Sequence, residues 1–136
     1  MAGALAALLL SIHPLPALET PSGNIRCFVT PAPNATLHCS LKQADYAGYV
    51  QKIRCGPPIG LDWAGFSLPA RSTATPTCSG GILYSPETQR PRYVTVPYGH
   101  ACRAGPFDCR STLAGLRCGN HTGHGLFISR RTYRLW

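Results

Sequence analysis

Residues 24–41 read NIRCFVTPAPNATLHCSL, and this stretch decides the fold class. It holds two strand-like runs, 24–30 and 35–41, joined by the turn sequence PAPN, in which proline and asparagine favour a reversal of the chain. Apolar residues recur at every second position of the first run, which is the period of a strand with one buried face. The stretch predicts an antiparallel hairpin that carries Cys27 on one strand and Cys39 on the other.

The other cysteines extend this interpretation along the chain. Cys109 and Cys118 flank a second turn, LAG, and repeat the hairpin arrangement, while Cys55 and Cys78 flank the segment that contains Trp63. Seven cysteines in a small chain are typical of a disulfide framework in an oxidising compartment. The two hairpins predict the bridges Cys27–Cys39 and Cys109–Cys118. The position of Cys55 and Cys78 on either side of the Trp63 segment predicts a third bridge between them, which leaves Cys102 as the free thiol. A bridge between Cys102 and Cys109 stays open as an alternative.

Composition agrees with a small all-β domain. The 136 residues include 14 Gly and 13 Pro, which interrupt helices and suit short antiparallel strands joined by turns. Residues 44–54 alone show helical spacing, although Gly48 leaves a strand possible there. We expect loop between residues 56 and 81, another strand over 93–98, and strands close to the C-terminus.

The N-terminus resembles an export signal. Residues 1–18 read MAGALAALLLSIHPLPAL, contain no charged side chain, and are too short in their apolar part to span a bilayer as a helix. We predict a signal peptide over residues 1–18 and a secreted or periplasmic domain over residues 19–136. The alternative is that the apolar run is a buried helix of the domain.

The charge balance points to an anionic partner. The chain has 13 Lys and Arg against 5 Asp and Glu, a formal net charge of +8. Arg130, Arg131 and Arg134 lie among the last seven residues and are interleaved with Tyr133 and Trp136. Alternating basic and aromatic side chains suit an anionic polymer or an envelope surface. We predict that these three arginines bind an anion, and the alternative is a solvated basic face.

Four motifs together resemble a known family. They read TPSGNIRC at 20–27, DW at 62–63, PYG at 97–99 and GHGLFISR at 123–130. In this order they resemble a family of small secreted bacterial domains of unknown function with a PSGNI-C start and a GHGF-SR finish. The resemblance covers nearly all of the predicted mature chain and implies export, an all-β domain and six paired cysteines, with Cys102 as a departure. It implies no activity.

Candidate catalytic and metal-binding groups are sparse. His100, His121 and His124 could bind zinc if the glycines around the last two turn the chain back, and Cys102 with His100 has the residue types of a thiol nucleophile and its base. Ordinary turn histidines and an unpaired thiol explain the same residues. We expect no catalytic residue, metal or cofactor, and interpret the protein as a non-enzymatic binding or structural module. The alternative is a small secreted hydrolase or metal-dependent enzyme that uses the three histidines.

Overall fold

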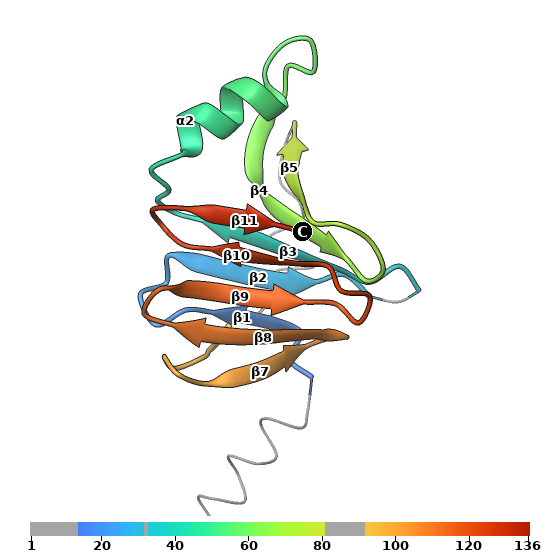
Figure 1. Ribbon diagram of the computed structural model, residues 1–136, viewed down its shortest axis with the longest axis vertical. Coiled ribbons are helices and arrows are strands. Elements are labelled where there is room, and N and C mark those ends of the chain that lie inside the picture. The colour runs from blue at the N-terminus through green and yellow to red at the C-terminus, as the bar shows by residue number, and fades with distance from the viewer. Residues whose placement is uncertain (1–13, 32, 81–91) are drawn as a thin grey trace, which may run out of the picture.

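Two β-sheets pack face to face in the computed structural model, which describes residues 14–31, 33–80 and 92–136 (Figure 1). The larger sheet has the strand order β5-β4-β3-β2-β1-β6 and the smaller sheet the order β11-β10-β9-β8-β7. All neighbouring strands run antiparallel except β1 and β6. The strands of the larger sheet are β1 (Ala17–Glu19), β2 (Ile25–Val29), β3 (Thr36–Leu41), β4 (Asp62–Pro69), β5 (Thr75–Ser79) and β6 (Val94–Thr95). Those of the smaller sheet are β7 (Ala101–Ala104), β8 (Phe107–Thr112), β9 (Gly115–Gly119), β10 (Gly125–Ile128) and β11 (Tyr133–Leu135).

The all-β prediction is confirmed, and both predicted hairpins are present. β2 pairs with β3 so that Cys27 lies opposite Cys39, and β8 pairs with β9 so that Cys109 lies opposite Cys118. Disulfides join both of these cysteine pairs, and a third disulfide joins Cys55 to Cys78. These are the three bridges predicted from the sequence. Cys102 is the free cysteine among the described residues.

The core lies between the two sheets, because buried positions alternate with less buried ones along strands of both sheets, such as β2, β3 and β8. Phe66 and Leu37 of the larger sheet are fully buried, as are Phe107 and Leu116 of the smaller one. Tyr46 closes one end of the core: its hydroxyl donates to the Ser129 carbonyl at 2.7 Å and its ring packs on aromatic rings of both sheets. One continuous cluster of apolar side chains thus holds the sandwich together.

The expectation of loop over residues 56–81 is wrong, since β4 and β5 lie inside this range. Prolines and glycines lie at both ends of this segment, and their presence favoured the prediction of a loop. The segment forms strands because β4 pairs with β3. The β4–β5 ladder also shifts register between Trp63 and Phe66, so the alternation of faces is broken midway. Residues 44–54 are helical over most of their length, as α2 (Ala47–Val50) followed by η1 (Gln51–Cys55), a π-helical turn. The strand expected over 93–98 shrinks to Val94–Thr95.

The predicted N-terminal boundary falls inside a strand of the structure. Residues 1–13 of the predicted signal peptide lie outside the described residues, but Ala17 and Leu18 are fully buried in β1. β1 lies between β2 and β6 in the larger sheet, and the Leu15 amide donates to the Arg103 carbonyl of β7 at 2.7 Å. A boundary after residue 18 therefore cuts through a strand, and the folded domain begins at Leu15 or earlier.

Candidate anion-binding face

A row of arginines crosses the outer face of the smaller sheet. Strand register places Arg110 opposite Arg117, Arg117 opposite Phe127, and Phe127 opposite Arg134, from β8 through β9 and β10 to β11. All three arginines are exposed, while Cys109 beside Arg110, Cys118 beside Arg117 and Leu126 beside Phe127 are buried in the core. Neighbouring strands lie about 4.8 Å apart, so the row brings three guanidinium groups onto one short surface. We call Arg110, Arg117, Phe127, Arg134 and Trp136 the arginine face.

Two glycines make room for the aromatic rings of this face. A Cβ at Gly125 would lie 2.8 Å from Cζ2 of Trp136, and one at Gly115 would lie 2.8 Å from Cζ of Phe127. Both rings thus rest directly on the backbone of the sheet, which any larger residue at those positions would prevent. The Arg117 guanidinium stacks 4.5 Å from the centre of the Trp136 ring, and that of Arg134 lies 5.9 Å from it. The rings therefore hold guanidinium groups in place rather than standing open to a ligand.

The charges at the β7 edge of the same face balance each other. Arg103 of β7 is also exposed, with Asp108 opposite it across β7 and β8. Arg110 donates from Nη1 to the Gly99 carbonyl at 3.1 Å, which leaves other guanidinium donors for an anion. Several preorganised guanidinium groups on one surface suit an anionic ligand. Each guanidinium group can bind a phosphate, sulfate or carboxylate group through two parallel hydrogen bonds.

The structure splits the cluster predicted at the C-terminus. Arg134 lies on the arginine face, whereas Arg130 and Arg131 lie in the turn between β10 and β11, where the Arg130 guanidinium contacts Asp45 at 3.5 Å. Tyr133 points inward and packs against Phe66, with ring centres 4.9 Å apart. Tyr133 and Arg134 face opposite sides of the sheet because they are adjacent residues of β11.

Sequence reasoning missed Arg110 and Arg117, the two central members of the face. Each lies one residue from a bridged cysteine, in the runs CRS and RCG. A cysteine that pairs across a sandwich hairpin points inward, so its strand neighbour points outward. That rule, applied to the predicted hairpin, would have placed both arginines on one outer face.

The three histidines are not brought together as a metal site. Among residues 14–31, 33–80 and 92–136, no group of three or more His, Cys, Asp or Glu side chains could hold a metal ion. His100 is exposed in the turn before β7, His121 is exposed in the β9–β10 connection, and His124 contacts Thr73 at 3.4 Å. Trp63 packs against Tyr46 and Phe66.

Cys102 is buried beside a disulfide. It lies directly opposite Cys109 across β7 and β8, and Cys109 is joined to Cys118 across β8 and β9. His100 is exposed while Cys102 faces the core, so the two do not share a strand face as a nucleophile and its base would. Burial raises the pKa of the Cys102 thiol to about 11, which keeps it protonated near neutral pH and opposes nucleophilic chemistry.

We expect native Cys102 to react slowly with iodoacetamide and to react fast in concentrated urea. At pH 8 a thiol with a pKa of about 11 is ionised in roughly one molecule in a thousand, and its rate should rise about tenfold per pH unit until the pH reaches its pKa. Mass spectrometry of the alkylated peptides measures the rate. Rapid labelling of the native protein, or a Cys102–Cys109 bridge in non-reducing peptide maps, would contradict the assignment.

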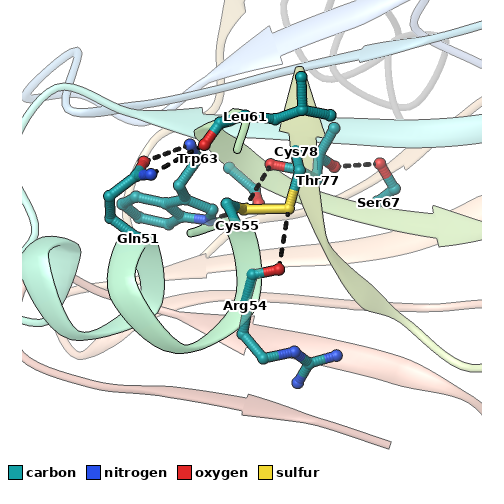
Figure 2. The surroundings of a disulfide bond; sticks show 9 residues. Gln51, Arg54, Cys55, Leu61, Trp63, Ser67, Thr77 and Cys78 are labelled. Carbon is teal, nitrogen blue, oxygen red and sulfur yellow. Dashed lines mark hydrogen bonds between the residues drawn. A yellow bond between two sulfur atoms is a disulfide. The ribbon is translucent and has the colours of Figure 1, made fainter. Parts of the chain in front are cut away.

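A serine–histidine contact was not anticipated either. On the larger sheet, His38 Nδ1 lies 2.8 Å from Ser67 Oγ. The Ser67 hydroxyl in turn contacts the Thr77 hydroxyl (Figure 2). Burial lowers the pKa of His38, so the imidazole is neutral at physiological pH. Among the described residues no ion pair joins His38 to a carboxylate that could orient the imidazole, so the contact is better explained as cross-strand stabilisation.

Comparison with known proteins identifies no relative: no family model, curated protein or solved structure matches this chain. The resemblance to secreted six-cysteine domains therefore stays a prediction. Within the described part of the chain, no helix is long and apolar enough to cross a membrane. The case for a function is made by the residues of the arginine face.

Proposed function

We propose that this protein is a secreted, non-enzymatic binding module that attaches to an anionic polymer at an envelope surface through the arginine face. The observation that carries the proposal is the row in which Arg110, Arg117 and Arg134 share one outer surface with Trp136 stacked among them. Three disulfides suit an oxidising compartment, which supports export. A net charge of +8 favours an anionic partner at long range.

The geometry supports recognition by charge rather than by stacking. Each aromatic ring of the face has glycine backbone beneath it, and the Trp136 ring also has the Arg117 guanidinium over it. A base or sugar ring would have to displace that cation before it could stack. We therefore propose that the ligand is recognised by its phosphate or sulfate groups, and that heparin and duplex DNA both serve as probes.

Replacing Arg110, Arg117 and Arg134 together with alanine is expected to weaken binding to duplex DNA and heparin by orders of magnitude. Each neutralised phosphate contributes about 0.9 to the slope of log affinity against log salt, so the slope should fall by up to about 3. Fluorescence titration with labelled duplex DNA at several salt concentrations measures it. Lysine at the same three positions keeps the charge but loses the bidentate fork, so we expect an intermediate affinity.

The matched control removes three exposed arginines from elsewhere: Arg71→Ala, Arg130→Ala and Arg131→Ala. Both triple variants lose the same net charge, so only the first should lose most of the binding if the face is the site. Thermal unfolding of both variants shows whether the loss of the Arg117–Trp136 contact loosens the sheet. Equal losses in the two variants, or no binding by the parent protein, would overturn the proposal.

A further inference from the structure

A second surface lies away from the arginine face and is apolar. α2, η1 and the loop that follows stand out at one end of the molecule's long axis (Figure 1). On this projecting segment Tyr49, Ile53 and Ile59 are 63%, 57% and 55% exposed. We call these three residues the apolar tip. Large apolar side chains exposed together on a projection mark interaction sites more often than they mark ordinary surface.

The apolar tip is held rigidly in its exposed position. The Cys55–Cys78 bridge anchors the end of η1 to β5, and the Gln51 side chain accepts from the Trp63 amide at 2.6 Å and donates to the Leu61 carbonyl at 2.8 Å (Figure 2). The Leu61 amide closes the loop by donating to the Cys55 carbonyl at 2.9 Å. Exposure of the three side chains is thus part of a cross-linked structure, not of a frayed end.

The charges on the projecting segment itself are basic. Residues 46–61 contain Lys52 and Arg54, both exposed, and no Asp or Glu, while the exposed Asp62 follows at the start of β4. Arg54 extends from the helix away from the disulfide (Figure 2). Asp45, just before the segment, contacts Arg130 instead. Aliphatic and aromatic side chains beside Lys and Arg are the combination with which peripheral proteins enter the interface of an anionic bilayer.

We propose that the apolar tip is a membrane-docking element that inserts Tyr49, Ile53 and Ile59 into the interfacial layer of a bilayer rich in anionic lipid. Lys52 and Arg54 contact the headgroups. This goes beyond binding by the arginine face, since it uses a different surface and a different contact. The long axis of the sandwich points at the membrane, and the arginine face on the flank stays free for a polymer.

The test is sedimentation of the full chain with vesicles of phosphatidylglycerol and phosphatidylcholine. We expect the protein to bind these vesicles more strongly than vesicles of pure phosphatidylcholine. The double substitution Ile53→Ser with Ile59→Ser should lower the affinity for the mixed vesicles by about tenfold per residue. The matched control is Tyr98→Ser with Leu113→Ser, two side chains that are 41% and 87% exposed off the tip. The control pair should bind vesicles as the parent does.

A second readout separates insertion from electrostatic attraction. Tryptophan in place of Tyr49 should be quenched by brominated lipids, whereas tryptophan in place of Leu113 should not. The variant that lacks Arg110, Arg117 and Arg134 should retain this quenching, so failure of the polymer-binding proposal is seen independently. Vesicle binding that is absent, or unaffected by the Ile53 and Ile59 changes, would overturn the proposal. Sedimentation velocity could instead reveal a dimer that the Ile53 and Ile59 changes abolish, in a protein that does not bind vesicles. That result would assign the apolar tip to contact with a second copy of the chain and would also overturn the membrane proposal.

Discussion

Replacing Gly65 with alanine is expected to destabilise the protein by about 3–5 kcal/mol, a large part of the roughly 5–15 kcal/mol that typically separates a folded domain from its unfolded state. Gly65 lies in β4 at a φ of 108°, a conformation that side chains with a Cβ rarely adopt. A Cβ built there would lie 1.9 Å from the Cys39 carbonyl oxygen and 2.9 Å from its carbon. Both are backbone atoms of β3, so neither can move without disturbing the pairing of β3 with β4.

Urea unfolding followed by tryptophan fluorescence measures this loss against a matched glycine. Gly48 lies in α2, has no positive φ, and has open space within 4 Å of the point that a Cβ would occupy. Gly48→Ala should therefore leave the free energy of unfolding unchanged or raise it by up to about 1 kcal/mol, through better helix propensity. A Gly65→Ala protein as stable as the parent would show that β3 and β4 are farther apart than the structure has them.

A chain that begins at Glu19 is expected to be at least about 4 kcal/mol less stable than one that begins at Pro14. The shorter chain loses Leu18, a fully buried side chain whose removal alone costs about 2–5 kcal/mol. It also loses the Pro16 carbonyl that accepts from the Val29 amide at 3.0 Å. β6 has β1 as its neighbour in the sheet, so the pairing of Val94 with Leu18 is lost as well.

Both chains can be made with the three bridges formed and compared by thermal unfolding. If the protein is exported as proposed, N-terminal sequencing of the mature form should find a start at or before Leu15, because cleavage after residue 18 would remove most of β1. Equal unfolding midpoints for the two chains would show that β1 contributes little. The burial of Ala17 and Leu18 would then add nothing to the free energy of unfolding.

Local sequence determined the parts of this protein whose partners lie close along the chain. The two hairpins and their bridges join cysteines only 12 and 9 residues apart, with turn residues between them. Closing so short a loop costs little entropy, and strand alternation then turns both cysteines to one face. The fold class and the free state of Cys102 follow from the same reasoning.

Only the tertiary structure decided the features that depend on distant segments. β1 is a strand because β2 and β6 border it, although its residues read equally well as the end of an export signal. β4 survives a break in its alternation because β3 pairs with it across a long connection. Arg110, Arg117 and Arg134 meet on one face because sheet order places β8, β9, β10 and β11 side by side. Strand pairing is a contact between segments, and no pattern within a single segment specifies its neighbour or the surface that the two then share.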